Sequence, residues 1–496
     1  MIAHIAMREV SDHLRTFRYL ALSLLSVLLI ALGTYLEARS YATRTETYTA
    51  MLRDQERTLG GDSTDSHRLQ GYGWTTNRTD APLRALRRPA TLSIWARGGD
   101  AALPGYWQFS PSGVQEGPPL GDTTSAIGTL ANVDYLFVCQ VILGLLAVLL
   151  TFDAISGERE SGTLRATLAH AVPRTSVVLG KFVGALLTLL PPLLLGTLVS
   201  LLVAASAGIA FWADGGWIRL MLLALGAASY LALFSAMGIA VSATTRSVKT
   251  SLVGSLVLWT TLVFVVPRLA ALTACLVDPV PSADVLARRM QGIATELVAE
   301  RQAMLAAAWV RSNGDAALPT SDFPVAVRDA YNAVRLPLES QLFQKRRSLL
   351  RGILDDKRRA EERRQSLFEV LARFSPAAVL EHLAGEATQT GAAEATRWTH
   401  RIEAHQRILE SSAFDRIFGV EIFNVRVGLM ISWSPDPREP RDMPPLPRDL
   451  PRFHLGNAPL RDVMAPAVRD LMLLMLPTAL LLAGACLVFQ RYDVRA

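Results

Sequence analysis

Residues 153–164 read Asp153-Ala-Ile-Ser-Gly-Glu-Arg-Glu-Ser-Gly-Thr-Leu164, a polar stretch between two long apolar runs. The upstream run, 133–152, is almost uncharged and long enough to cross a bilayer. Downstream, no charged residue occurs from Phe182 to Trp212. Charged side chains and turns are costly in hydrocarbon, so the polar stretch must lie in water at one membrane face. A short charged helix in this position is placed to pass a push from a soluble partner into the membrane.

Apolar runs of membrane-spanning length recur on both sides of this stretch, which predicts a multi-span membrane protein. The six expected spans are 19–37, 133–152, 176–212, 220–243, 250–277 and 467–490. The fifth passes Pro267-Arg268, and we expect its last part to be re-entrant at the outer face. The predicted fold class is a mainly α membrane protein, with six transmembrane helices and a large, mostly helical extracytoplasmic domain with minor β structure.

The chain has a net charge of +6, and arginines provide most of its positive charge. Lys and Arg flank the spans in four short segments, which the positive-inside rule places in the cytoplasm. These segments are 1–18, 153–175, 244–249 and 491–496. Both termini are then cytoplasmic, and the outer segments are 38–132, 213–219 and 278–466. Because the basic residues follow the membrane boundaries, we expect membrane lipid and no nucleic acid as a partner.

The N-terminal residues 2–17 place apolar side chains on one helical stripe, which predicts an amphipathic helix on the inner membrane surface. An ordinary cytoplasmic tail is the alternative. Ala31-Leu-Gly33 weakly resembles a signal cleavage site, but the apolar run around it is longer than a typical signal core. An uncleaved signal anchor is therefore the preferred interpretation.

The first outer segment is expected to begin as a helix and then to become irregular. No Gly or Pro occurs from 38 to 59, so the helix of the first span continues to Leu59, where Gly60-Gly61 ends it. In the Gly- and Pro-rich remainder, Thr91–Arg97 is the best strand candidate.

The second outer segment is mostly helical in pattern, with long stretches at Ala287–Val310 and Leu336–Arg373. The second stretch is densely charged, which is usual for a solvated helix face with acidic partners. Binding of a phospholipid or another anion is the alternative. Val420–Trp433 is β-prone, and the proline-rich Pro435–Pro451 predicts an extended strap that leads back to the sixth span.

The third span contains two adjacent prolines, Pro191 and Pro192. Proline removes a backbone hydrogen bond and kinks a helix. The pair therefore predicts either a hinge or a static bend.

Sequence motifs of catalysis are missing. No GxxxxGK[ST] occurs, so the chain has no P-loop for nucleotide phosphates. There is no HExxH and no GxSxG, and the five-residue spacing of His400 and His405 does not converge on a metal. Cys139, Cys275 and Cys486 lie in or beside spans, where packing explains them. We expect that the chain is not an enzyme and binds neither a metal nor a cofactor.

The polar stretch and the residues after it resemble the cytoplasmic signature of ABC type-2 permeases, the membrane subunits of ATP-driven exporters. The matching parts are Glu158-Arg-Glu160, Gly162-Thr-Leu164, Pro173-Arg-Thr-Ser176 and Leu179-Gly-Lys181. The outer segments are similar to a subfamily with a large outer domain of unknown function. That similarity is carried by Arg88–Gly98, Pro281-Ser282 and Phe374–Leu380.

The resemblance implies that 153–175 forms a coupling helix region on which a separate ABC ATPase dimer docks. ATP and Mg belong to that ATPase. Two permease copies, or this chain and a paralogue, surround a shared path in the bacterial cytoplasmic (inner) membrane. The implied coupling residues are Asp153, Gly157, Glu158, Arg159, Glu160, Gly162, Thr163 and Leu164.

Among these residues, we expect Glu158, Arg159 and Glu160 to make polar contacts with the ATPase, and we expect Glu158 to do so rather than hold the fold. The glycines are expected to permit tight turns or a close approach. A solvated connecting loop whose charges only fix the topology is the alternative.

The expected function is that of a permease subunit that couples ATP hydrolysis to export or extraction of an unidentified substrate. The outer segments are far larger than in minimal drug-efflux permeases, which keeps two alternatives open. One is a mechanical ABC complex that acts on a periplasmic partner protein without substrate passage. The other is a non-transporting membrane scaffold or sensor.

Overall fold

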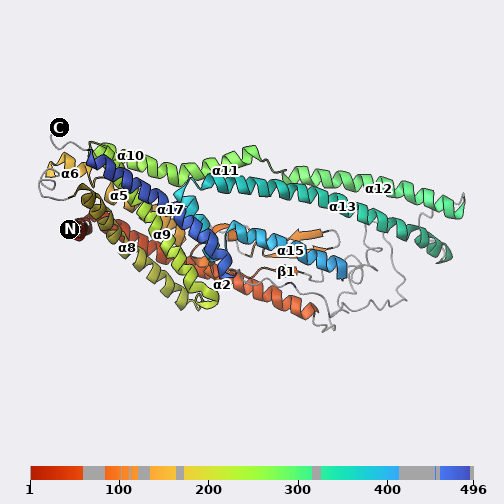
Figure 1. Ribbon diagram of the computed structural model, residues 1–496. Helices are drawn as coiled ribbons and strands as arrows, with labels where there is room; N and C mark the ends of the chain where they lie inside the picture. The colour runs from red at the N-terminus through yellow and green to blue at the C-terminus, as the bar shows by residue number, and fades with distance from the viewer. Residues whose placement is uncertain are drawn as a thin grey trace.

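The computed structural model describes residues 2–59, 84–101, 103–110, 113–120, 134–163, 173–314, 325–412, 453 and 459–491. The molecule is long and mostly helical (Figure 1). We call the end that holds α1 (Ile2–Leu14), α6 (Ser156–Glu160) and the end of α17 (Leu460–Gln490) the terminal end, and the opposite end the distal end. Four predictions lie outside the described residues: Leu164, Gly60-Gly61, Val420–Trp433 and Pro435–Pro451.

Six helical stretches in the described part are long and apolar enough to cross a membrane. They are α2 (Phe17–Leu59), Tyr135–Glu160, α8 (Arg174–Ser206), α9 (Gly216–Thr244), Val248–Val277 and α17. Tyr135–Glu160 includes α4 (Tyr135–Phe137), the π-helical η4 (Val138–Leu143) and α5 (Gly144–Thr151), with α6 at its end. The predicted class, a mainly α membrane protein with six spans, is confirmed.

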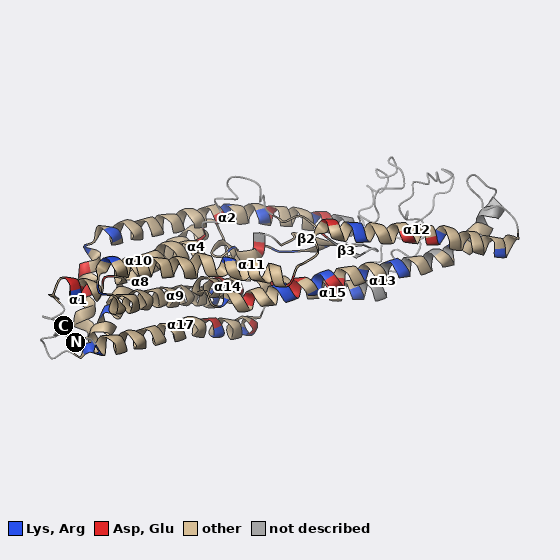
Figure 2. Ribbon diagram, turned by 90° about the horizontal axis from the view of Figure 1, so that it is seen from above, with Lys and Arg blue, Asp and Glu red and all other residues tan. Residues whose placement is uncertain are grey.

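The most central span is α9, where Tyr230 and Phe234 are fully buried. It packs against α5, α8 and α17. Outward-facing leucines on α8 and α17 are exposed, as expected of surfaces that meet lipid tails. Figure 2 shows charged residues at the terminal end and in the distal part, with a largely uncharged band between them.

The width of this band fits a bilayer. The stretches 19–36, 250–267 and 471–490 carry no charged residue. About 20 helical residues cross the hydrocarbon. The membrane boundary on the distal side, which we call the distal boundary, therefore lies near the first charged residues found toward the distal end of these stretches, Glu37, Arg268 and Asp470. Helix α2 continues as one helix beyond this boundary to Leu59, as predicted.

The re-entrant part expected in 250–277 is not found. Instead, α10 (Val248–Thr260), the π-helical η6 (Thr261–Val265) and α11 (Val266–Val277) form one continuous span. Pro267 lies in the first turn of α11, where a missing N–H is best tolerated. The chain therefore passes proline without turning, and α11 continues beyond Arg268.

A long hairpin of α12 (Ala283–Asn313) and α13 (Val325–Ala372) forms the distal end (Figure 1). Leu305 and Trp309 are buried, and the Trp309 ring lies 6.0 Å from that of Tyr331. Helix α13 begins before the predicted Leu336 and passes through Pro337. It also packs along α11, so the hairpin is joined to the fifth span.

A small antiparallel sheet has the order β1 (Arg84–Leu86), β2 (Tyr106–Ser110) and β3 (Gly113–Glu116), with Ala85 opposite Trp107. It packs on α15 (Ala392–Ser412), where Trp107 stacks on Trp398 at 5.2 Å.

The strand predicted at Thr91–Arg97 is wrong. Residues Thr91–Ile94 form the 3₁₀ helix η2, in which Leu92, Ser93 and Ile94 are all buried. A second 3₁₀ helix, η3 (Gly98–Ala101), follows it. Consecutive burial excludes the two-sided alternation of a strand. The segment ends on α8, where Trp95 Nε1 donates to Ser200 Oγ at 2.9 Å.

Helix α14 (Pro376–Thr388) lies within the predicted outer segment 278–466 and packs against α9 and α17 of the helix bundle. Ser375 Oγ donates to the Leu262 carbonyl at 2.6 Å, and Gln140 Nε2 donates to the Ala377 carbonyl at 2.9 Å. Leu262 lies six residues before Arg268, so α14 begins about 9 Å below the distal boundary. Gln140 and Leu262, the two partners of α14, both lie in π-helical turns, which are frequent at functional sites.

Candidate functional site

The polar stretch folds as a turn followed by the short helix α6, at the terminal end (Figure 1). The Asp153 carbonyl accepts from the Gly157 N–H at 2.8 Å, which begins the helix. Ser242 Oγ on α9 accepts from the N–H groups of Ile155 and Ser156, both at 3.0 Å. The start of α6 is therefore fixed to the fourth span.

Glu158 forms an ion pair within its own chain. Its Oε1 lies 2.9 Å from Lys181 Nζ on α8, and the same ammonium binds Glu9 of α1. Only 4% of the Lys181 side chain is exposed. A buried ammonium requires carboxylate partners, because desolvation of an unpaired charge is very costly. One cation thus joins α1, α6 and the third span.

The neighbouring His13 extends this network. Its Nε2 lies 3.7 Å from Glu9 Oε2, and its Nδ1 lies 3.3 Å from Thr188 Oγ1. Burial lowers the pKa of the His13 imidazole, and the nearby carboxylates oppose that shift. Helix α1 therefore packs along α8 through polar as well as apolar contacts.

Arg159 and Glu160 bind the two helix ends that meet beside α6. Arg159 Nη1 donates to the Thr245 carbonyl at 2.7 Å, at the C-terminus of α9. Glu160 Oε2 accepts from the Val248 N–H at 2.9 Å, at the N-terminus of α10. A cation at a helix C-terminus and an anion at an N-terminus both match the helix dipole. The side chains of Glu158, Arg159 and Glu160 thus each have a partner within the same chain.

These contacts correct one part of the prediction for Glu158, because its side chain is paired within the chain and ties α6 to α8. The side chains of Arg159 and Glu160 tie α6 to α9 and α10. Charges in a sequence do not reveal their partners, and Lys181 lies 23 residues beyond Glu158. Contact of the same residues with an ATPase stays a prediction.

Within the described part of the stretch, residues 160–163 are exposed. Gly162 has φ +76°, a backbone conformation that favours glycine, and Ser161 Oγ lies 2.9 Å from Thr163 Oγ1. At Gly157, the nearest atom to an added Cβ would be Asp153 Cβ at 3.4 Å, an ordinary contact. The tight turn expected of the glycines is therefore found at Gly162 and not at Gly157.

Pro191 and Pro192 lie inside α8, which remains one helix from Arg174 to Ser206. The helix is not interrupted at the pair, and a hinge at this position stays a prediction. His400 and His405 point to separate neighbours: His400 contacts Arg358 at 3.1 Å, and His405 packs on Phe109.

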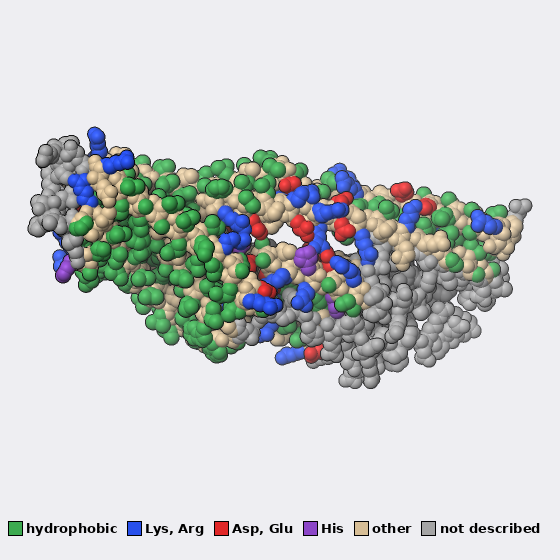
Figure 3. All heavy atoms as spheres, in the orientation of Figure 1, with side chains coloured by type: hydrophobic (Ala, Val, Ile, Leu, Met, Phe, Trp, Pro, Cys, Tyr) green, Lys and Arg blue, Asp and Glu red, His purple; other side chains and the backbone are tan. Residues whose placement is uncertain are grey.

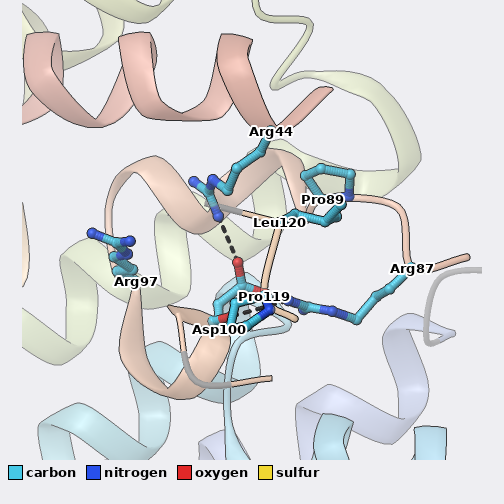
Figure 4. A pocket seen from close by; sticks show the side chains of 7 residues that line it. All are labelled: Arg44, Arg87, Pro89, Arg97, Asp100, Pro119 and Leu120. Atoms are coloured by element: carbon cyan, nitrogen blue, oxygen red, sulfur yellow. Dashed lines mark hydrogen bonds and ion pairs between the residues drawn. The ribbon is translucent and has the colours of Figure 1, made fainter. Parts of the chain in front are cut away.

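A second polar cluster, which no sequence pattern predicts, joins α2 to the segment 87–100 just beyond the distal boundary (Figure 4). Arg44 Nη1 lies 2.6 Å from Asp100 Oδ2, and Arg87 binds the other oxygen of that carboxylate. Arg97 Nη1 lies 3.4 Å from Glu37 Oε1. All five side chains are at most 8% exposed. The Arg88–Gly98 motif resembles a family motif, but nothing in it points to partners in the first span.

The fold and the site together define an integral membrane subunit with a polar helix clamped at its terminal face and a large domain on the opposite side. Over residues 3–494 the chain matches the family described as "ABC-2 family transporter protein", and it belongs to that family. It is therefore the membrane subunit of an ABC transporter.

One curated relative is the "Probable ABC transporter permease protein NosY" of Stutzerimonas stutzeri. The two chains are 37% identical over 112 residues, which are 20% of this chain and 40% of the relative. The chain thus matches less than half of that relative's length.

Proposed function

We propose that this chain is the permease subunit through which a separate ABC ATPase drives export or extraction of a substrate. The supporting observation is the clamp around α6, in which the side chains of 158–160 bind α8, α9 and α10. A helix attached to three different membrane helices distributes a displacement among them. The terminal face is then cytoplasmic, as the positive flanks predict, and the membrane is the bacterial inner membrane.

In this proposal, the exposed residues 160–163 dock on the ATPase, and the partly buried ion pair Glu158–Lys181 transmits the motion of α6 to α8. ATP and Mg are held by the ATPase dimer, and two membrane subunits, identical or paralogous, face each other above it. When the ATPase closes on ATP, α6 moves with it. Lys181 carries that motion to α1 and α8, while Arg159 and Glu160 carry it to the ends of α9 and α10.

Two variants, each purified together with the ATPase, distinguish docking of the ATPase from transmission of its motion to the membrane helices. Glu158→Gln removes one ion pair but leaves Lys181 its second carboxylate, Glu9. We expect the complex to stay intact while stimulation of ATP hydrolysis falls several-fold, since loss of one partner of a partly buried ion pair weakens the link between α6 and α8. Thr163→Arg should instead reduce co-elution of the ATPase.

Asp12→Asn, at an exposed carboxylate on the same face, is the matched control and should change neither readout. If Glu158→Gln keeps full stimulation, transmission through Lys181 is rejected. If Thr163→Arg keeps full co-elution, the docking surface is elsewhere.

A second candidate is a mechanical complex that acts on a periplasmic partner. It is favoured by the distal domain, where α2 and the fifth span continue into the domain without a break. ATP hydrolysis stimulated by a soluble periplasmic protein, without substrate flux, would select this candidate over export.

A further inference from the structure

The polar cluster between α2 and the segment 87–100 holds more guanidinium groups than carboxylates. Its buried members are Arg44, Arg87, Arg97, Glu37 and Asp100. Both oxygens of Asp100 bind an arginine, and Glu37 lies between the other two pairs, 3.4 Å from Arg97 and 3.7 Å from Arg44. Figure 4 shows the three arginines on different sides of Asp100. Three buried cations thus share two buried anions.

A further carboxylate lies beside the cluster but has other partners. Asp134 Oδ2 accepts from the Arg97 N–H at 3.2 Å, and Oδ1 accepts from the Phe137 N–H at 2.8 Å. Asp134 therefore caps α4 through backbone groups, and within the described residues it forms no ion pair with a guanidinium. Burying a charge without a counter-charge is very costly, so the third guanidinium favours binding of an anion.

Two of the arginines also have a buried N–H group without an acceptor among the described residues. Arg44 donates through Nη1 to Asp100 at 2.6 Å and through Nη2 to Ser93 Oγ at 3.2 Å, but its Nε has no acceptor. Arg97 donates through Nη1 to Glu37, and its Nε likewise has no acceptor. Since buried donors are nearly always paired, these two groups favour binding of an acceptor.

The three arginines and Asp100 line a cavity, which Pro89, Pro119 and Leu120 complete. Its volume is about 10 Å³, which is room for one water or one small ion. A phosphate ester is much larger than this. The three apolar residues also favour a weakly hydrated ion with a single charge, because such an ion loses less hydration energy on entry.

The cavity lies on the water side of the distal boundary. Arg44 comes seven residues after Glu37, about 10 Å farther along α2. Figure 3 shows charged side chains on the surface where the hydrophobic band of the membrane part ends. Ions are excluded from hydrocarbon but not from this level of the molecule.

We propose that this cavity binds a small monovalent anion of the size of chloride. The anion would accept from N–H groups of Arg44 and Arg97 and balance the third guanidinium. It would thereby tie α2, which carries Arg44, to the segment 87–100, which carries Arg97. Binding requires neither the ATPase nor a transported substrate, so this site is separate from the coupling of ATP hydrolysis.

The test is thermal unfolding of the purified full chain in detergent, with gluconate replaced stepwise by chloride at constant ionic strength. Gluconate is too large for the cavity. A ligand that binds only the folded chain raises the unfolding midpoint as its concentration rises. We expect chloride to raise the midpoint of the parent by several degrees, and bromide, which is similar in size and charge, to do the same.

Two variants and a control assign the effect to the cavity. Arg97→Gln leaves two guanidiniums for two carboxylates, so the dependence on chloride should be lost. Arg97→Lys keeps the charge and should retain part of the dependence, which separates loss of the site from misfolding. Arg53→Gln, at an exposed arginine of α2, is the matched control and should respond to chloride as the parent does.

Equal chloride dependence in the parent and in Arg97→Gln overturns the proposal, because the salt then acts elsewhere. A parent that does not respond also overturns it and assigns a water to the cavity. If phosphatidylglycerol raises the midpoint in gluconate and chloride does not, the cluster is assigned to a lipid phosphate.

If Arg97→Gln does not fold, crystals of the parent grown in bromide decide the question. An anomalous peak within hydrogen-bond distance of Arg44 and Arg97 supports the site, and bromide found only on the surface rejects it. Because no ATPase takes part, failure here is independent of failure of the coupling test.

Discussion

Lys181 holds a full charge in a nearly closed site, and two carboxylates on different helices share it. Lys181→Met keeps the length of the side chain but leaves Glu9 and Glu158 without their cation. We expect a loss of about 3–5 kcal/mol in stability, because removing one partner of a buried pair leaves uncompensated charge. Thermal unfolding of the purified protein in detergent measures it.

Lys249→Met, at an exposed lysine of the same face, is the control and should stay within about 0.5 kcal/mol of the parent. Equal midpoints for the two variants would mean that the buried triad does not hold the fold.

His382 on α14 donates to Asp470 on α17, with Nδ1 and Oδ2 2.6 Å apart. The hydrogen bond to Asp470 raises the pKa of His382 above its ordinary 6.5; burial opposes the shift, and Glu386 and Glu369 support it. Arg469 also lies 3.6 Å from Asp470. A raised folded pKa adds stability that is complete below pH 6.5 and is lost as the pH rises through the folded pKa.

The stability difference between the parent and His382→Asn should therefore be largest in acid and shrink toward alkaline pH. Unfolding midpoints between about pH 5.5 and 8.5 test this, with His4→Asn, at an exposed histidine, as control. A difference that stays constant with pH would show that the pair does not depend on the imidazole charge.

At the scale of elements, α14 is seated in the bundle through a close approach to α9. An added Cβ at Gly226 would meet Leu383 Cδ2 at 2.8 Å and Leu380 Cδ1 at 3.2 Å. Ser375, which caps α14, is 0% exposed. A cysteine at 375 should therefore react slowly with an impermeant maleimide.

Adding Gly226→Val to Ser375→Cys should raise the labelling rate severalfold, because the valine displaces α14 from its seat. Gly292→Val on α12, where nothing lies within 4 Å of an added Cβ, should leave the rate unchanged. Unchanged labelling in both would mean that α14 does not depend on this contact.

The spans were predictable from sequence because they depend on one local property, the absence of charge over about 20 residues. Helix α2 beyond the membrane was predictable for a similar reason, since no Gly or Pro interrupts it between 38 and 59. Both features follow from consecutive residues.

Features that depend on distant partners were missed. Thr91–Ile94 has a β-prone composition, but contact with α2 and α8 turns it into a 3₁₀ helix. Glu158 has the pattern of a docking residue, yet its partner lies on another helix. The position of α14 depends on the Leu262 carbonyl and the Gln140 side chain, both in π-helical turns, and no sequence pattern in 278–466 predicts these partners.

For the whole molecule, the charge-free band predicts opposite accessibility of its two ends. Gln302→Cys on α12 and Thr250→Cys on α10 are both at exposed positions, in a chain without its native cysteines. In intact cells, an impermeant maleimide should label the first and not the second. After permeabilisation both should react, and labelling of Thr250→Cys alone in intact cells would reverse the orientation.

The continuity of α2 has a mechanical consequence. Its 43 residues make a rod about 65 Å long with no joint at the membrane surface. Beyond that surface, Arg44 fastens the rod to the carboxylate of Asp100 and so to the segment beside the sheet. A tilt of about 10° about the terminal end would sweep Leu59 through about 11 Å. A small change of tilt within the lipid would therefore become a nanometre-scale displacement at the far side.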